Sequence, residues 1–283
     1  MKRILPLIKN VEELEKEIAF EEKNILKTAL HELETKLAKN DSETIEIQKK
    51  LVLKQEKDFD ALNLIRHSAI ENLNQILMKF IGRNFTNSDS EHWPLFSAIS
   101  NSERDTLRIL EIGTADGLTA VILASLFPQS EIVTIDLPQD NELFKSSYNR
   151  NTVVKEYVNQ RDELINTLEN ITFIEMNSIK LNSWSDKSFD LIWVDGAHGY
   201  PVLPLDLQNA CRLIKENGIV IVDDVFINVR KADEMYRSTA AIQTLKLFQE
   251  NKLIKNYRLL RKRLGLKYNF KDLNEKFLGV IEF

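Results

Sequence analysis

The chain has 283 residues, of which 43% are hydrophobic and 29% are charged, and its formal net charge is −5. This is the composition of an ordinary globular protein, and only 8 Gly and 6 Pro exclude a collagen-like or low-complexity chain. The single cysteine, Cys211, excludes an intramolecular disulfide or a cysteine-rich zinc site and indicates a reducing, cytoplasmic setting. The negative charge argues against a protein built mainly to coat nucleic acid.

No apolar run is long enough to span a bilayer, so we expect no membrane span. The apolar stretch 4–8 is short and is followed by acidic residues, so we expect no signal peptide.

Residues 1–83 contain a single glycine, Gly82, and are rich in Glu, Lys and Leu, which favour helices. Apolar residues recur at three- and four-residue steps over 11–37 and again over 62–80, so each stretch predicts a helix with one apolar stripe. Each stripe needs a partner, which is either the rest of the chain or a second copy. The region is therefore expected to form a homodimer or to cap a substrate site.

The polar residues 84–105 are interpreted as a linker that docks one aromatic patch around Trp93. From Leu107 onward short β-branched runs alternate with helical patterns. Strands are expected at 107–112, 131–136, 171–175, 189–195, 218–223, 257–260 and 277–283, and helices at 118–127, 141–168, 203–215 and 239–251. This alternation predicts an α/β domain over 106–283, with a Rossmann-like, doubly wound, mostly parallel seven-stranded sheet and an antiparallel C-terminal edge strand.

A glycine turn follows the first of these strands, from Gly113 to Gly117. Small residues let the backbone approach a ligand, and the N-terminus of the next helix offers unpaired amides. Asp136 ends the second strand, where a carboxylate can accept both hydroxyls of an adenosine ribose. Alone, the turn suits an unliganded connection and Asp136 suits a helix N-cap, but together they favour ligand binding.

Acidic residues follow two further strands, with Asp195 after the fourth and Asp223 and Asp224 after the fifth. If these strands are neighbours, three carboxylates converge and need a proton or a cation to neutralise them. Oxygen ligands favour Mg²⁺ or Ca²⁺, although solvated loop acids or helix caps remain the alternative. His198 titrates near neutral pH and can accept a proton from a substrate hydroxyl, whereas the remaining histidines (His31, His67 and His92) are interpreted as surface or packing residues.

From about Leu107 the chain resembles class I S-adenosylmethionine-dependent methyltransferases, and among them the metal-dependent small-molecule and sugar O-methyltransferases. The resemblance lies in the Glu111-x-Gly113-x-x-x-Gly117 turn, the acid Asp136, the Asn177-Ser178 pair after the third strand, and the motifs Asp195-Gly-Ala-His198 and Asp223-Asp224. Two positions depart from the family pattern: Ala115 stands where many members have glycine, and Asp223-Asp224 replaces the Asp-Asn pair of catechol-type members.

The resemblance implies three sets of site residues. The cofactor S-adenosylmethionine would be bound by Glu111, Gly113, Thr114, Ala115, Asp116, Gly117, Asp136, Asn177, Ser178 and Asp195. Mg²⁺ or another divalent cation would be held by Asp195, Asp223 and Asp224, and the catalytic residues would be His198, as general base, and Asp195. The acceptor would be a hydroxyl of a small molecule, with a sugar or saccharide-linked metabolite as the leading class.

Three other functions were weighed against this one. A nicotinamide-dependent oxidoreductase is disfavoured because the turn lacks the Gly-x-Gly-x-x-Gly spacing. A nucleic-acid methyltransferase would use the basic run 252–271, although no Asn-Pro-Pro-Tyr motif is present. Such a run is more often a solvated strand and loop, or a contact with acidic residues of its own fold. The third is a non-catalytic scaffold with a relic cofactor pocket. Weaker candidates for substrate contact are Trp93, Tyr200, Arg230 and Arg237.

Overall fold

In a computed structural model, the structure describes residues 42–86, 89–102, 106–147, 153–229, 237–262 and 276–283. Its contacts divide the chain into one unit before Val52 and a second unit from Val52 to Phe283. The whole sheet and every candidate site residue belong to the second unit, in which the helix α3 (Ser42–Asp60) also ends. The apolar stripe expected over 11–37 lies outside the described residues.

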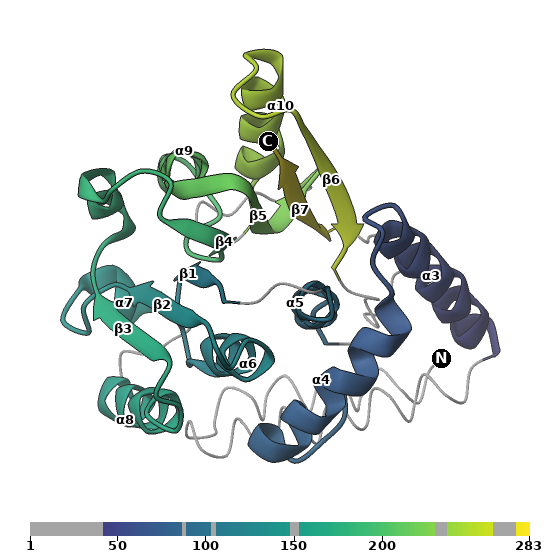
Figure 1. Ribbon diagram of the computed structural model, residues 1–283, viewed down its shortest axis with the longest axis horizontal. Helices are drawn as coiled ribbons and strands as arrows, with labels where there is room; N and C mark the ends of the chain where they lie inside the picture. Colours follow the sequence, from purple (N-terminus) through teal and green to yellow (C-terminus); the bar gives the residue numbers. More distant parts are fainter. Residues whose placement is uncertain (1–41, 87–88, 103–105, 148–152, 230–236, 263–275) are drawn as a thin grey trace, which may run out of the picture. The chain divides into compact units, whose positions relative to one another are not determined.

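The centre of the second unit is a seven-stranded sheet (Figure 1). Its strands are β1 (Arg108–Ile112), β2 (Glu131–Asp136), β3 (Ile171–Glu175), β4 (Phe189–Val194), β5 (Ile214–Phe226), β6 (Asn256–Arg261) and β7 (Lys276–Glu282). The order is β3-β2-β1-β4-β5-β7-β6, with β7 antiparallel to both of its neighbours and the pairs among β1 to β5 parallel. This confirms the predicted fold class and adds that the last strand inserts between β5 and β6, which leaves β6 at the edge.

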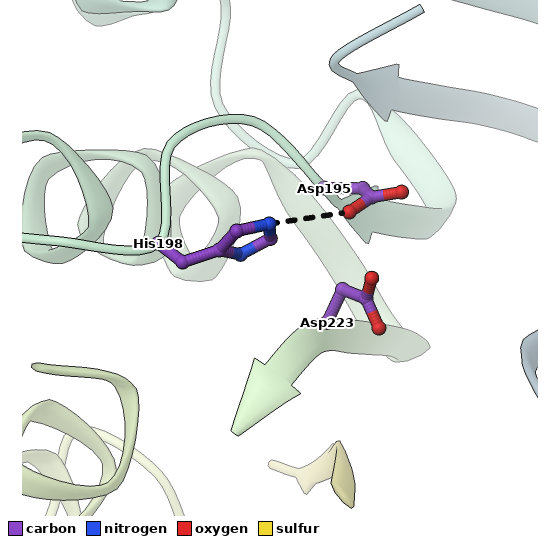
Figure 2. Close-up of side chains that lie close together, drawn as sticks. All are labelled: Asp195, His198 and Asp223. Carbon is purple, nitrogen blue, oxygen red and sulfur yellow. Dashed lines mark ion pairs between the residues drawn. The ribbon is translucent and has the colours of Figure 1, made fainter. Parts of the chain in front are cut away.

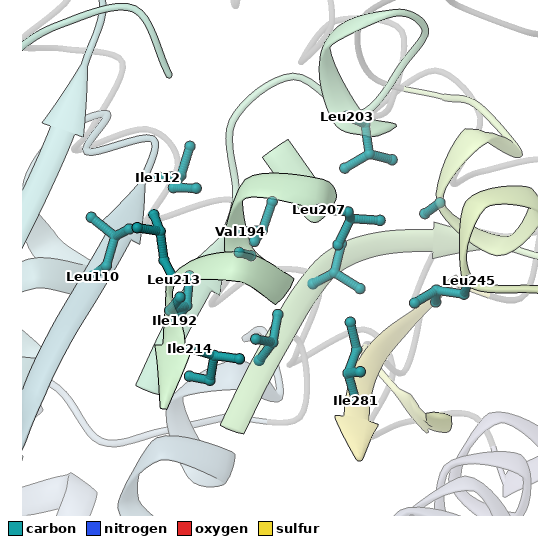
Figure 3. Close-up of a cluster of buried hydrophobic side chains, with 14 of the residues drawn as sticks. Leu110, Ile112, Ile192, Val194, Leu203, Leu207, Leu213, Ile214, Leu245 and Ile281 are labelled. Carbon is teal, nitrogen blue, oxygen red and sulfur yellow. The ribbon is translucent and has the colours of Figure 1, made fainter. Parts of the chain in front are cut away.

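Helices cover both faces of the sheet because strand side chains alternate in direction. On one face β1, β4 and β5 send residues such as Leu110, Val194 and Val222 into a core shared with α9 (Val202–Leu213) and α10 (Ala240–Glu250) (Figure 3). On the other face alternate residues such as Ile109 and Trp193 pack against α4 (Arg66–Ile81), α5 (His92–Ser100) and α6 (Leu118–Leu126). The remaining elements are α7 (Glu142–Ser146), α8 (Val154–Ile165) and the 3₁₀ helix η2 (Ser178–Ser183).

The helix α4 resolves the question of what covers the apolar stripe over 62–80. Its residues Ala69, Leu73 and Leu77 are fully buried in the same core as α5 and α6, so the partner of this stripe is the protein's own chain. The segment 84–105 contains the buried helix α5 where the sequence predicted a linker. Seven of its nine residues are buried, and a helix that is apolar on every side is typical of a core position.

Among the described residues, no helix is both long and apolar enough to cross a membrane.

Candidate active site

The candidate site lies where the strand order reverses. The chain runs from β1 outward to β2 and β3 and then returns to β4 on the other side of β1. Loops leaving the carboxyl ends of β1 and β4 therefore diverge, and this is the position at which open parallel sheets bind ligands. The turn 113–117 and Asp195 begin at these two strand ends, and Asp223 lies at the equivalent level of the next strand, β5.

Gly113 is required by the close approach of two loops. Its φ angle is 101°, and a Cβ atom at this position would lie 2.3 Å from the carbonyl oxygen of Asp195. The amide of Asp195 in turn donates to the carbonyl of Ile112 at 2.8 Å, so the loops after β1 and β4 are joined directly. Ala115 (φ 48°) and Gly117 (φ 81°) are also left-handed, which produces the tight turn into α6.

Asp136 is held toward the turn by two backbone amides. Its Oδ2 accepts a hydrogen bond from the Ala115 amide at 2.9 Å, and its Oδ1 accepts one from Leu137 at 2.7 Å. The side chain is only half-buried, and a carboxylate at the end of this strand can accept the hydroxyls of a ribose.

The loop after β3 lies beside Asp136, because the Met176 amide donates to the Asp136 carbonyl at 2.7 Å. Asn177 then caps η2, with its side chain accepting from the Ile179 amide at 3.0 Å, and Ser178 is the first residue of that helix. The residues predicted to bind the adenosine part of the cofactor therefore follow neighbouring strand ends. Asp116, in the turn, is exposed and accepts from the Leu118 amide at the start of α6.

Glu111 lies behind the turn with its side chain fully buried. Its Oε2 accepts a hydrogen bond from the Thr134 hydroxyl at 2.5 Å, and that hydroxyl also bonds to Thr114 at 2.6 Å. Burial raises the pKa of Glu111 to about 8, so this carboxyl is mainly protonated at neutral pH. Its Oε1 has no hydrogen-bond partner among the described residues.

The acidic residues converge as expected, because β4 and β5 are parallel neighbours with Val194 opposite Val222. Asp195 and His198 face one another above Asp223 (Figure 2), and one side-chain nitrogen or oxygen from each lies within 4.8 Å of the others. His198 Nε2 is 3.6 Å from Asp195 Oδ1 and 3.8 Å from Asp224 Oδ2. The loop after β4 and the end of β5 thus form one acid–histidine cluster (Asp195, His198, Asp223 and Asp224).

His198 is buried, with 4% of its side chain exposed. Burial lowers its pKa, although the charges of Asp224 and Asp223 oppose that shift, so the imidazole is neutral at neutral pH. Its Nδ1 has no hydrogen-bond partner among the described residues, whereas its Nε2 faces the carboxyl groups. The ring is thus positioned to accept a proton next to groups that stabilise the resulting imidazolium.

Two lysines complete the cluster, and the sequence did not single out either as a site residue: Lys262 directly follows β6, and Lys276 begins β7. The Lys262 ammonium donates to Asp223 Oδ2 and also to Asp224 Oδ1, the second at 2.5 Å. Lys276 lies 2.6 Å from the same Asp224 oxygen. The sequence placed Lys262 in a basic run expected to be solvated or to contact acidic residues of its own fold. The second alternative holds for Lys262, whose side chain is 5% exposed, because the pairing of β7 with β5 and β6 brings it to the acids.

The pKa values of the two central carboxyl groups are shifted in opposite directions. Burial and the nearby charge of Asp223 raise the pKa of Asp195 well above its ordinary value. Burial acts in the same direction on Asp223, but the Lys262 ammonium and the Asp195 carboxyl outweigh it and lower the pKa of Asp223. Of the two, Asp195 is therefore the carboxyl that is protonated more readily. His92 of α5 also lowers the pKa of Asp223; it is buried and stacks on Trp193 at 4.9 Å.

A second residue that the sequence did not single out, Asp206 of α9, lies beneath the loop after β4. It is buried, and a Cβ atom on Gly196 would lie 3.4 Å from its Oδ2. Burial raises the pKa of Asp206 to about 7. In the sequence, the only sign of such a buried acid is a polar residue among apolar neighbours of the same helix.

The weaker candidates for substrate contact are scattered. Tyr200 is exposed and its hydroxyl donates to Gln243 Oε1 at 2.8 Å, while Trp93 packs at the edge of the His92 ring. Arg237 is exposed, and Arg230 lies outside the described residues.

Residues 110–225 match a family model described as a methyltransferase domain. The matched segment contains every predicted cofactor, metal and catalytic residue, and it ends before Lys262 and Lys276. This part of the chain is therefore similar to a methyltransferase domain, in agreement with the resemblance to methyltransferases predicted from the sequence. A search among curated proteins finds no match.

Solved structures share the general arrangement at low identity. The CurJ carbon methyltransferase is 16% identical over 67% of this chain and 52% of its own, with a TM-score of 0.45, so the chain spans about half the length of that protein. A Staphylococcus aureus protein assigned as a caffeoyl-CoA O-methyltransferase is 23% identical over 65% and 78% of the two chains, with a TM-score of 0.39. A Klebsiella pneumoniae protein assigned as an O-methyltransferase is 18% identical over 77% and 90%, with a TM-score of 0.43.

Proposed function

We propose that the protein transfers a methyl group from S-adenosylmethionine to a hydroxyl of a small molecule, with a sugar or saccharide-linked metabolite as the leading class of acceptor. The observation that carries this proposal is the acid–histidine cluster beside the glycine turn, at the point where the strand order reverses. Deprotonation of a hydroxyl requires a base, and the buried, neutral imidazole of His198 can act as one. It lies next to the expected position of the cofactor.

The residues present suit the proposed cofactor. The left-handed turn at 113–117 exposes backbone rather than large side chains, and the Ala115 and Leu137 amides fix the carboxylate of Asp136 beside it. The adjacent loop with Asn177 adds polar groups for an adenine edge. S-adenosylmethionine supplies an electrophilic methyl group on a sulfonium, and its departure as a neutral thioether takes the electron pair of the broken C–S bond.

His198 is the proposed general base. Its Nε2 accepts the hydroxyl proton as the new O–CH₃ bond forms, and the carboxylate of Asp224, whose Oδ2 is 3.8 Å from Nε2, stabilises the charged ring. The remaining contribution of the protein is to position the hydroxyl in line with the methyl group and to exclude water. Asp195 is the cluster member best placed to orient the hydroxyl, because a quarter of its side chain is exposed (26%).

Metal assistance, which the sequence also predicted, has mixed support from the residues. The spacing of Asp195, His198 and Asp223 suits a divalent ion. However, Lys262 already contacts both Asp223 and Asp224, so these oxygens have cationic partners from the chain itself. The donor set therefore does not fit the predicted metal triad, and no step of the proposed reaction uses a metal.

A nucleic-acid substrate is less well supported. Within the described part of the basic run 252–271, Arg258 pairs with Glu282, Arg261 pairs with Asp58, and Lys262 is buried among acids. These side chains neutralise the protein's own carboxylates rather than forming a stripe that could follow phosphates. In the N-terminal region 1–83, the stripe over 62–80 packs on the protein's own core, and a cap or dimerisation role stays a prediction for the residues before it.

The proposal is tested by transfer of an isotopically labelled methyl group to a panel of catechols, sugars and glycosides. We expect labelled product from at least one hydroxyl acceptor, and a fall in kcat of about 100-fold or more in His198→Gln. The matched control is His67→Gln, because His67 lies on the exposed face of α4. Transfer that persists undiminished in His198→Gln would remove the proposed base, and binding of cofactor without transfer to any acceptor would favour the scaffold alternative.

A further inference from the structure

We infer that Lys262 and Lys276 are the resident cations of the acid–histidine cluster, so that the site works without a divalent metal ion. This inference deepens the proposed function, and its claim that the site is active rests on that function. The cation content of the cluster can be measured independently. The inference starts from two carboxylates, Asp223 and Asp224, which face two ammonium groups at hydrogen-bonding distance.

Hydrogen bonds on both sides of the Lys262 backbone hold this residue in place, so its contact with the acids is not an incidental surface contact. Its backbone amide donates to the Lys276 carbonyl at 3.0 Å, and its carbonyl accepts from the Glu91 amide at 2.9 Å. The preceding residue, Arg261, is fixed by Asp58, which accepts from the Arg261 amide at 3.0 Å and from its guanidinium at 2.9 Å. Hydrogen bonds from α3 and from the residue preceding α5 therefore direct the ammonium of Lys262 to the acids.

The lysines use one oxygen of each of the two aspartates that follow one another in the predicted metal triad. Lys262 contacts Asp223 Oδ2 and Asp224 Oδ1, and Lys276 shares the same Oδ1 of Asp224. The donors that remain are Asp195, His198, Asp223 Oδ1 and Asp224 Oδ2, and a divalent ion bound to them would be separated from the Lys262 ammonium only by the carboxyl groups that both contact. Two positive charges at such a separation repel strongly where the surroundings exclude water, and Lys262 is only 5% exposed.

Lys262 also acts on the proposed base through the acids that it holds. Asp224 Oδ2 is 3.8 Å from His198 Nε2, while Asp224 Oδ1 is the oxygen bound by both lysines. Asp224 itself has a left-handed backbone (φ 51°) at an irregularity in the pairing of β5 with β7, and the two ammonium groups hold it there. We therefore assign Lys262 as a positioning residue.

The test is the binding of Mn²⁺, measured by electron paramagnetic resonance of the free ion, on the full chain and without substrate. We expect no binding to the wild-type protein at micromolar concentrations. Replacing the ammonium with an apolar chain of similar length, in Lys262→Met or Lys276→Met, leaves the carboxylates uncompensated and should tighten Mn²⁺ binding at least about tenfold. Lys246→Met, on the exposed side of α10, is the matched control and should change nothing.

Specific outcomes overturn the inference. Stoichiometric Mn²⁺ binding by the wild-type protein that is lost in Asp223→Asn would show a metal site beside the lysines. Unchanged Mn²⁺ affinity in both folded lysine variants would show that the lysines do not fill the cation position. If Lys262→Met does not fold, as judged by circular dichroism, Lys276→Met and the wild-type titration decide the question.

The failure of this inference and the failure of the proposed function are distinguishable. Binding of S-adenosylhomocysteine reports the cofactor site and not the cation content, so it is measured on the same samples by calorimetry. With the cofactor site intact, methyl transfer that survives a chelator supports the inference, and transfer that is abolished by the chelator and restored by Mg²⁺ refutes it.

Discussion

Glu111 offers a stability test that depends on one buried carboxyl. Its side chain is fully buried, one oxygen accepts from Thr134 at 2.5 Å, and burial raises its pKa to about 8 from an ordinary value of 4.5. Because the folded protein holds this proton more tightly than the unfolded chain, the stabilisation is complete below about pH 4.5. It is lost progressively as the pH rises to about 8.

The size of the effect follows from the two pKa values. Each pKa unit corresponds to about 1.4 kcal/mol, so wild-type protein should lose about 3 kcal/mol of unfolding free energy through Glu111 between pH 6 and pH 9. Glu111→Gln is nearly isosteric with the protonated acid and does not ionise. The variant should therefore gain about 3 kcal/mol over the wild-type protein across this range.

The assay is urea unfolding followed by tryptophan fluorescence at pH 6 and pH 9, for wild-type protein, Glu111→Gln and Glu169→Gln. Glu169 is exposed, so its replacement is the control for loss of a charge alone. Taking the difference between variants cancels the other titrating groups. Equal stability changes for Glu111→Gln at both pH values would refute the idea that a buried, protonated carboxyl supports the turn.

Three further predictions concern the same region. Gly113→Ala should lower the free energy of unfolding by about 2–5 kcal/mol, because the new Cβ atom would lie 2.3 Å from the Asp195 carbonyl oxygen. Gly82→Ala is the control and should lower it less, because nothing lies within 4 Å of its Cβ position. Equal losses in urea unfolding would contradict the close approach. The advantage in unfolding free energy of Asp206→Asn over the wild-type protein should grow from pH 5 to pH 8, because burial raises the pKa of Asp206 to about 7. A stability difference that does not change with pH would exclude this cause. The profile of kcat/KM against pH should fall on the acid side with a midpoint below 6.5, because burial lowers the pKa of His198; a midpoint above 7 would contradict a neutral, desolvated base.

Much of the fold was predictable because its signals are local. The strands of the sheet appear as short β-branched runs. The turn at 113–117 and Asp195 follow directly after two of them, and Asp223 and Asp224, predicted to follow the fifth strand, lie within its last residues. Parallel strands place their carboxyl ends at one edge, so the convergence of Asp195 with Asp223 could be inferred from order alone.

The parts that could not be predicted depend on long-range pairing. Lys262 lies 39 residues from Asp223 in the chain, and only the antiparallel pairing of β7 with β5 and β6 brings it to the acids. In the sequence it belongs to a basic run, in which burial leaves no trace. His92 was interpreted as a surface or packing residue, and its stacking on Trp193 agrees with packing, but its effect of lowering the pKa of Asp223 depends on where α5 places it. The helix α5 itself has nine residues, too few for apolar periodicity to stand out.

The central claim, a cofactor site for S-adenosylmethionine formed by the turn at 113–117 and Asp136, is tested most directly by calorimetric titration of S-adenosylhomocysteine. We expect micromolar binding by the wild-type protein and by the control Asp140→Asn, since Asp140 is exposed just beyond the strand end. Asp136→Asn should weaken binding by about tenfold or more, because each lost charge-assisted hydrogen bond is worth about 1.5 kcal/mol or more. The absence of binding by wild-type protein, or binding that is unchanged in Asp136→Asn, would contradict the claim.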